Sequence, residues 1–231
     1  HNKQNNNCCY KNVLDSFIEG EISHLTPVTM LPDPTRPGLF TIPGKNVEDG
    51  FVQRQEIDVL VPILHGTFGE DGTLQGLFEI ANVAYVGAGV LGASVGMDKG
   101  IFKDVMLANN IPVVDGVIVL RRELESSMDE MLDQIEAHLA STYPVFVKPA
   151  NMGSSVGVSK CRNRSDLMEG LMEAGRFDRR VLVEKGINAR EIEISVLGND
   201  DPKASVPGEI RPAADFYSYD AKYHDDRSEA F

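Results

Sequence analysis

The sequence is poor in cysteine and has no long apolar run. Its three cysteines are the adjacent pair Cys8 and Cys9 and the distant Cys161, which form neither a disulfide framework nor a spaced zinc site. The apolar runs are far shorter than the roughly 18 residues that a membrane span requires. The amino terminus has no basic segment followed by an apolar one, so no secretory signal is expected. We therefore expect a soluble protein of a reducing compartment, the cytoplasm.

Positive charge is also scarce. The 231 residues include 22 Lys and Arg against 35 Asp and Glu, which gives a formal net charge of −13. Proteins that bind nucleic acid or an anionic membrane through sequence-independent electrostatics need the opposite balance, so we expect neither partner. An apolar fraction of 42% with 25% charged residues is ordinary for a globular protein.

From Gln55 onward, short β-rich apolar runs alternate with helical patterns, which predicts an α/β fold with a largely parallel sheet. The strongest strand is expected over 57–64, where nearly continuous apolar residues suit a strand covered on both faces. Further strands are expected at 83–86, 117–120, 145–148, 181–185 and 191–196, and helices at 73–81, 98–108 and 165–174. Before Gln55, prolines and scattered glycines predict an irregular connection.

Another helix is expected to begin at Ser127. Ser127 and Glu130 have the spacing of a capping box, in which side chains satisfy the exposed amides of the first turn. Apolar residues follow at helical spacing at positions 128, 131, 132, 135 and 139. A stripe of this kind is typical of a helix face that packs in the core.

Two glycine-rich loops compete as phosphate binders. The segment from Gly87 to Gly92 matches G-x-G-x-x-G after a short strand, which allows a dinucleotide-binding unit and an NAD-dependent oxidoreductase, although a tight turn explains the glycines as well. The segment from Gly153 to Gly157 follows a strand that ends near Lys148, and its glycines and serines let the backbone wrap an anion. It is not a Walker A loop, and on its own it is equally typical of a flexible hairpin.

Lysines beside turns favour the second loop. Lys99, Lys148, Lys185 and Lys222 each lie next to a turn in this acidic chain. Each alone is typical of a solvated surface lysine, but together they indicate a local anion site within a negative overall field.

Five segments then resemble one family in its own order. They are IDVLVPILHGTFGEDGTLQGLFEIANVAYVGAGVLG at 57–92, MDK at 97–99, VKPANMGSSVGVSK at 147–160, VEKGINAREIEISVLG at 183–198 and FYSYDAKY at 216–223. They resemble the D-alanine–D-alanine ligases of the ATP-grasp superfamily. The resemblance implies an ATP-grasp architecture, α+β in part, behind a Rossmann-like N-terminal domain. It implies a partial N-terminal α/β domain over 1–90, a central ATP-grasp domain over 91–183, and the start of a C-terminal ATP-grasp domain with a lid loop over 184–231.

The resemblance also implies how ATP is bound. Lys99 and Lys148 would contact its phosphates, and a loop would close over them. That loop consists of Gly153, Ser154, Ser155, Val156 and Gly157. Glu184, Lys185 and Ile187 would border the adenine, which backbone groups of the 184–187 hinge would read. Glu191 would hold the ribose hydroxyls.

For the reaction, the resemblance implies a pair formed by Ser154 and Tyr223 near two D-alanines, with His65 close to the first. Lys222 and Tyr223 would belong to a lid loop that excludes water. The implied activity is ATP-dependent synthesis of D-alanyl-D-alanine through an acyl phosphate, for peptidoglycan. Tyr223 favours an amine as second substrate, and a ligase that uses D-lactate or D-serine is the alternative.

The sequence departs from the family at both ends. It lacks the family's glycine-rich first turn, and the ligands of Mg²⁺ or Mn²⁺ are expected beyond Phe231. We therefore expect a part of a longer ligase, inactive as it stands. The family resemblance further implies a homodimer.

Overall fold

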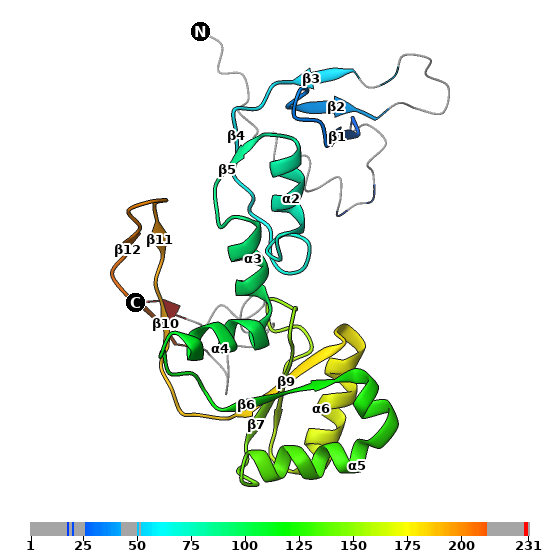
Figure 1. Ribbon diagram of the computed structural model, residues 1–231, viewed down its shortest axis with the longest axis vertical. Coiled ribbons are helices and arrows are strands. Elements are labelled where there is room, and N and C mark those ends of the chain that lie inside the picture. The colour runs from blue at the N-terminus through cyan, green and yellow to red at the C-terminus, as the bar shows by residue number, and fades with distance from the viewer. Residues whose placement is uncertain are drawn as a thin grey trace. The chain divides into compact units, whose positions relative to one another are not determined.

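The computed structural model describes residues 26–42, 50 and 52–211, together with residues 18, 20, 229 and 230. The chain forms two compact units, one made of residues 1–62 and 76–87 and the other of residues 63–75 and 88–231 (Figure 1). Within the described residues, no helix is both long and apolar enough to cross a membrane.

The first unit begins with a small antiparallel sheet. Strands β1 (Val28–Met30), β2 (Leu39–Thr41) and β3 (Gln53–Gln55) pair in the order β1-β2-β3, and Phe40 on β2 is 1% exposed. The prediction of an irregular connection before Gln55 is therefore wrong for these strands. Prolines 32, 34 and 37 lie between β1 and β2, where a missing N–H interrupts no ladder.

The same unit contains a parallel pair. Strand β4 (Val59–Leu60) pairs with β5 (Ala84–Tyr85), and helix α2 (Thr73–Ile80) lies between them in sequence. The strand predicted over 57–64 is thus reduced to two residues. Its apolar side chains are not covered on both faces, since Val59 is 53% and Val61 59% exposed.

The second unit holds a four-stranded sheet that is antiparallel throughout. Strands β6 (Gly116–Leu120), β7 (Val145–Pro149), β8 (Ser159–Cys161) and β9 (Arg180–Lys185) pair in the order β6-β9-β7-β8. The strands predicted at 117–120, 145–148 and 181–185 are confirmed. The prediction of a largely parallel sheet is wrong for this sheet. β6 and β7 run in the same direction, yet β9 enters between them, and a strand–helix alternation in sequence does not reveal such an insertion.

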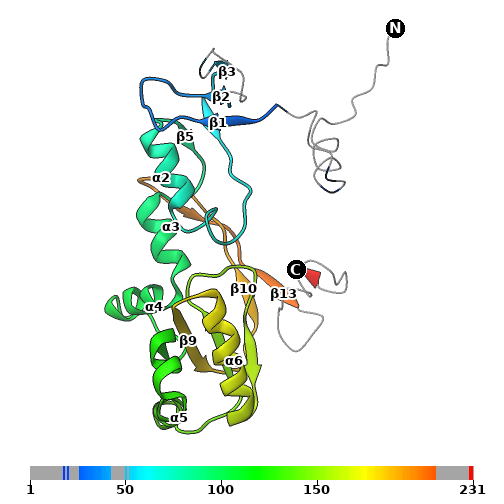
Figure 2. The ribbon, with the colours of Figure 1, turned by 90° about the vertical axis from the view of Figure 1, so that its right-hand side faces the viewer.

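Two helices pack against this sheet. Helices α5 (Arg121–His138) and α6 (Arg164–Phe177) cover one side of it in both ribbon views (Figures 1 and 2). Leu132 and Ile135 of α5 and Leu171 of α6 are at most 2% exposed and meet Val147 and Val183 of the sheet. The stripe predicted from position 128 to position 139 is therefore core.

Helix α5 begins earlier than the sequence pattern predicts. Its first turn is at Arg121, and the Glu123 carboxylate accepts a hydrogen bond from the Leu120 amide at 2.9 Å. Ser127 has φ −155° and ψ 60°, which marks a kink inside the helix. The predicted start at Ser127 is therefore wrong, although the position does break the helix.

Helices α3 (Val90–Met97) and α4 (Lys99–Ala108) follow the glycine-rich turn. Gly87 has φ +129°, a conformation that favours glycine, and Gly89 is the N-cap of α3. A tight turn therefore accounts for the G-x-G-x-x-G spacing.

The last strands are short, and the first three of them are exposed. They are β10 (Glu191–Glu193), β11 (Val196–Leu197), β12 (Lys203–Ala204), β13 (Gly208–Arg211) and β14 (Glu229–Ala230). The strand predicted over 191–196 is interrupted at 194–195. Its apolar face is not buried, because Ile192 is 45% and Ile194 53% exposed.

Candidate active site

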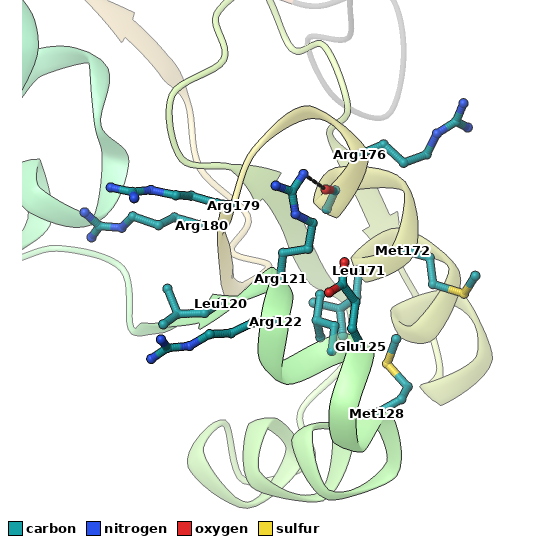
Figure 3. Close-up of a pocket in the computed structure, with 12 residues that line it drawn as sticks. Leu120, Arg121, Arg122, Glu125, Met128, Leu171, Met172, Arg176, Arg179 and Arg180 are labelled. Atoms are coloured by element: carbon teal, nitrogen blue, oxygen red, sulfur yellow. Dashed lines mark hydrogen bonds between the residues drawn. The ribbon is translucent and has the colours of Figure 1, made fainter.

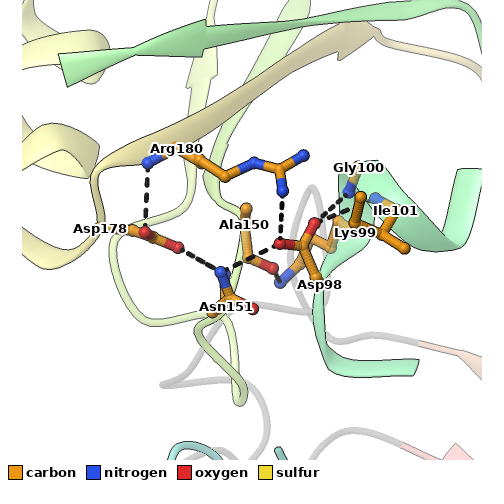
Figure 4. A network of polar contacts seen from close by, with 8 residues as sticks. All are labelled: Asp98, Lys99, Gly100, Ile101, Ala150, Asn151, Asp178 and Arg180. Carbon is orange, nitrogen blue, oxygen red and sulfur yellow. Dashed lines mark hydrogen bonds and ion pairs between the residues drawn. The ribbon is translucent and has the colours of Figure 1, made fainter. Parts of the chain in front are cut away.

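The start of α4 is fixed by a buried polar network (Figure 4). The Asp98 carboxylate accepts from two backbone amides in the first turn of α4, both at 3.0 Å, and forms an ion pair with Arg180 at 3.1 Å. Asn151 donates from its side chain to Asp98 at 3.2 Å and to Asp178 at 3.0 Å. Helix α4, the end of β7 and the start of β9 are thereby joined.

Lys99 points from this helix start into the segment that follows β7. Its ammonium donates to the backbone oxygens of Pro149, Ala150 and Met152 at 3.2, 3.3 and 2.7 Å. Burial, with the nearby charge of Lys148, lowers the pKa of Lys99 to about 8. The site therefore holds a cation that is costly to keep charged and that an anion would stabilise.

Lys148 and Lys103 share one carboxylate. Lys148 forms a close ion pair with Glu184 Oε1, and Lys103 Nζ lies 2.7 Å from Glu184 Oε2 and donates to the Val114 oxygen at 2.7 Å. Burial alone would raise the pKa of the Glu184 carboxyl, but the positive charges of Lys148 and Lys103 outweigh it and hold that pKa below its usual value. Strands β7 and β9 place Lys148 and Glu184 together, and α4 supplies Lys103.

Two glycine-containing loops meet in close contact. A Cβ at Gly153 would lie 2.8 Å from the Cα of Gly66, so the backbones approach as only glycine allows. The hydroxyl of Thr67 donates to the Asn151 oxygen at 3.1 Å. Together the loops enclose a cavity of about 480 Å³, lined by His65, Gly66, Thr67, Met152, Gly153, Ser154 and Val156.

The backbone of the 153–157 loop is unusual. Ser154, Ser155 and Gly157 have φ of 52°, 59° and 68°, and the Val156 amide donates to the Gly153 oxygen at 3.1 Å. Left-handed conformations are rare for serine and cluster where ligands are bound. Successive turn residues of this type aim backbone amides at a common point, which suits an anion.

The remaining predicted contacts for the nucleotide lie at or after the end of β9. Lys185 forms an ion pair with Asp115 at 2.9 Å, and its amide donates to the Asp115 oxygen at 3.0 Å. Ile187 is 59% exposed, and Glu191 is exposed on β10. Within the described ranges Glu191 forms no ion pair. Lys103 and Lys148 pair with Glu184 instead, so no ion pair joins Glu191 to them.

The structure therefore joins most of the predicted set. His65 and Ser154 line one cavity, Lys99 contacts the start of the loop, and Lys148 pairs with Glu184. Tyr223 and Lys222 lie outside the described residues. No group of three or more His, Cys, Asp or Glu able to hold a metal ion occurs in the part of the chain that the structure describes.

Sequence reasoning missed the residues that support this site. Lys103, Asn151, Asp178 and Arg180 received no role, although each holds a predicted site residue or its helix in place. The available signal was position, because Asn151 directly follows the Lys148–Pro149–Ala150 strand end and Arg180 opens the strand that carries Glu184.

Comparison with known proteins gives one consistent family. The family model described as D-ala D-ala ligase C-terminus matches residues 105–231, and that described as D-ala D-ala ligase N-terminus matches 41–88. The D-alanine–D-alanine ligase of Heliobacterium modesticaldum is 51% identical over 214 residues, which cover 92% of this chain and 56% of that protein. That of Natranaerobius thermophilus is 47% identical over 201 residues, which cover 87% and 53%.

Solved structures agree. The VanG D-Ala:D-Ser ligase from Enterococcus faecalis superposes with a TM-score of 0.75 at 32% identity, over 96% of this chain and 60% of that one. The D-alanine–D-alanine ligase from Coxiella burnetii gives 0.68 at 35% identity, over 85% and 53%. None of these four relatives is an oxidoreductase, so the alternative role for Gly87 to Gly92 gains no support. The chain spans about half the length of the curated relatives it matches, and by fold, family models and identity it belongs to the D-alanine–D-alanine ligase family, with an ATP-grasp architecture of α+β type.

Proposed function

We propose that the protein joins two D-alanines with ATP to make D-alanyl-D-alanine for peptidoglycan. The observation that carries this proposal is the packing of Gly153 on Gly66, together with the contact between Lys99 and the Met152 oxygen. These two contacts bring together three features from segments far apart in sequence: the Lys99 ammonium, a loop suited to phosphate, and the cavity lined by His65.

In the first step, a carboxylate oxygen of one D-alanine attacks the γ-phosphorus of ATP, ADP leaves, and an acyl phosphate forms. Phosphoryl transfer depends on positioning and on neutralising charge rather than on covalent help from the protein. Lys99, Lys148 and the loop from Gly153 to Gly157 are the groups that we assign to this role.

In the second step, the amine of the other D-alanine attacks the acyl carbon, loses a proton, and phosphate leaves. The oxyanion that forms in between needs preorganised donors. We assign substrate contacts to His65 and Ser154, with Tyr223 as the hydroxyl partner of Ser154. Lys222 and Tyr223 would close over the acyl phosphate and keep water out.

Adenosine would lie at the end of β9. Both carboxylate oxygens of Glu184 are held by lysines, so the backbone of residues 184–187 is the part of that hinge suited to the adenine edge. Lys185 and Ile187 would border the ring. Glu191 would accept the ribose hydroxyls, which requires β10 to approach the nucleotide.

The domain limits stay proposals, at 1–90, 91–183 and 184–231. A cytoplasmic location and a homodimer are likewise proposed from the family. Mg²⁺ or Mn²⁺ would supply further charge neutralisation when bound, but the described residues provide no cluster for it, and we assign it no ligand in them.

The first experiment measures ADP release by the full-length protein with D-alanine and with L-alanine. We expect release only with D-alanine. Lys148→Ala should weaken ATP binding by roughly 1.5–3 kcal/mol, the range for a hydrogen bond to a charged group. Lys203→Ala, at an exposed lysine of β12, is the matched control. Equal stimulation by L-alanine, or equal ATP affinity in both variants, would contradict the proposal.

One observation keeps a second substrate class in view. The VanG structure, titled a D-Ala:D-Ser ligase, covers 96% of this chain at a TM-score of 0.75. Competition between D-alanine, D-serine and D-lactate, near neutral and at alkaline pH, separates the possibilities because an amine gains nucleophilicity as it loses its proton. A preference for D-lactate at every pH would exclude the amine.

A further inference from the structure

One cavity of the second unit has no role in the proposed reaction. It has a volume of about 1060 Å³ and lies between the first turns of α5 and the last turns of α6 (Figure 3). We call it the arginine pocket. Its lining consists of Leu120, Arg121, Arg122, Leu124, Glu125, Met128, Leu171, Met172, Gly175, Arg176, Arg179 and Arg180.

The pocket concentrates positive charge in an acidic chain. Five of its twelve lining residues are arginines, whereas Glu125 is its only carboxylate, and the chain as a whole has a net charge of −13. Antiparallel pairing causes this concentration. Leu120 at the end of β6 pairs with Arg180, and the Arg121 amide donates to the Arg179 oxygen at 2.8 Å. Two Arg-Arg dipeptides, at 121–122 and 179–180, therefore lie beside each other.

Three of the arginines already have partners. Arg180 pairs with Asp98 at 3.1 Å and Arg176 with Glu173 at 3.0 Å, and Arg121 donates to the backbone oxygen of Gly175 at 3.1 Å. Figure 3 shows Arg176 extending away from the other labelled arginines. The guanidinium groups of these three residues therefore have fewer N–H donors available for a ligand in the pocket.

Arg122 and Arg179 are different. Both are exposed, and among the residues that the structure describes no carboxylate oxygen lies within 4.0 Å of either guanidinium. In Figure 3 the two side chains extend in the same direction, Arg122 from α5 and Arg179 from the position just before β9, on the side opposite Met128 and Met172. The first turn of the 18-residue helix α5 adds its positive dipole end at the same place.

The floor of the pocket is apolar. Leu124 and Leu171 are 7% and 0% exposed, and Met128 and Met172 complete the lining between the two helices. A ligand that fits both parts has an anionic group for the arginines and an apolar or aromatic group for the floor. Guanidinium groups match phosphate oxygens in bidentate geometry, which favours phosphate over a simple carboxylate.

We propose that the arginine pocket binds a small molecule that carries a polyphosphate chain and an aromatic group, of the class of nucleoside polyphosphates, at a site separate from the ATP site. Arg122 and Arg179 bind the phosphates, and the leucine and methionine side chains contact the aromatic group. A volume of about 1060 Å³ lies just above the range of about 300–1,000 Å³ that is usual for small-molecule sites, so the pocket has room for a ligand of this size.

The test is calorimetric titration of the full-length protein with GTP and with inorganic tripolyphosphate. All titrations use a Lys148→Gln background, so that phosphate binding at the proposed ATP site is weakened. The test variant adds R122Q and R179Q, and the matched control adds R162Q, an exposed arginine outside the pocket. Circular dichroism melting verifies that each variant is folded.

We expect GTP to bind more tightly than tripolyphosphate, and the R122Q/R179Q variant to lose about tenfold or more in affinity for both. The R162Q control should bind both as the background does. Absence of binding, equal affinity in the test and control variants, or tighter binding of tripolyphosphate than of GTP would each overturn the proposal. None of these results depends on whether the ligase assignment is correct, because the ATP site is altered in every sample.

Discussion

If Lys99 contacts the phosphates of ATP as proposed, its lowered pKa predicts that ATP binding depends on pH. The Lys99 ammonium is buried against three backbone oxygens and near Lys148, and its pKa is lowered to about 8. An amine contacts phosphate as a charged ammonium only while it is protonated, so we expect tight ATP binding only while Lys99 carries its proton. The apparent dissociation constant should therefore rise as pH increases through the pKa of the free protein.

The size of the effect follows from that pKa. If only the protonated form binds, the apparent dissociation constant is multiplied by 1 + 10^(pH − pKa). For a pKa of about 8, this factor is about 1.3 at pH 7.5 and about 11 at pH 9, which is a loss of about eightfold in affinity. Phosphate groups have lost their last proton by pH 7.5, since their second pKa is about 6, so the ligand itself contributes little change.

The assay is titration with a non-hydrolysable ATP analogue, without D-alanine, at pH 7.5 and pH 9. Lys99→Arg is the control, because a guanidinium stays charged over this range. We expect a steep loss in the parent and a flat profile in the variant. A flat profile in the parent, or the same slope in both proteins, would refute the reasoning, because deprotonation of Lys99 would then not control ATP binding.

Three further changes test the support around the site. Lys103→Met leaves Glu184 with Lys148 as its only ion-pair partner among the described residues, so Lys148 should be less available to phosphate. We expect calorimetry to show ATP analogue binding weakened by about 1–3 kcal/mol, and an unchanged affinity would contradict this role for Lys103. Gly153→Ala places a Cβ 2.8 Å from the Cα of Gly66, which should force the two loops apart and reduce D-alanine-dependent ADP release, and activity at the parent level would argue against the close packing. Leu171→Ala opens a cavity under α6 and should lower the free energy of unfolding in urea by about 2–5 kcal/mol; a loss below 1 kcal/mol would mean that Leu171 is not a core residue.

The sequence predicted the strands and loops of the candidate site better than it predicted their arrangement. Strands were expected at 145–148 and 181–185, and β7 and β9 occupy these positions. Lys148 lies opposite Leu182 in their register, so Lys148 and Glu184 are diagonal neighbours on one face of the sheet. The antiparallel order β6-β9-β7-β8 was not expected, because the alternation of strand and helix in sequence is the same whether a neighbouring strand is parallel or inserted.

The supporting residues were beyond the reach of local patterns for a related reason. Lys103 lies 81 positions before Glu184, and Asp98 lies 82 positions before Arg180, so each ion pair exists only after α4 docks beside β9. No periodicity links such positions. The alternating pattern at Ile192 and Ile194 predicted a buried apolar face, but both side chains are exposed. A strand pattern indicates which face is apolar but not what covers that face.

The pairing of the site's lysines bears on how strongly they bind phosphate. Lys99 donates to three backbone oxygens. Lys148 and Lys103 each form an ion pair with one carboxylate oxygen of Glu184. These oxygens occupy the donors that phosphate would take, so ATP binding at the proposed site would exchange one set of contacts for another, and only the difference in free energy would appear as affinity. Removing Lys148 also leaves Glu184 with one cation in place of two, which is itself costly for a buried carboxylate. The loss measured for Lys148→Ala therefore combines a missing phosphate contact with a perturbed Glu184. A double-mutant cycle with Lys148→Ala, Glu184→Gln and the double variant separates the two contributions.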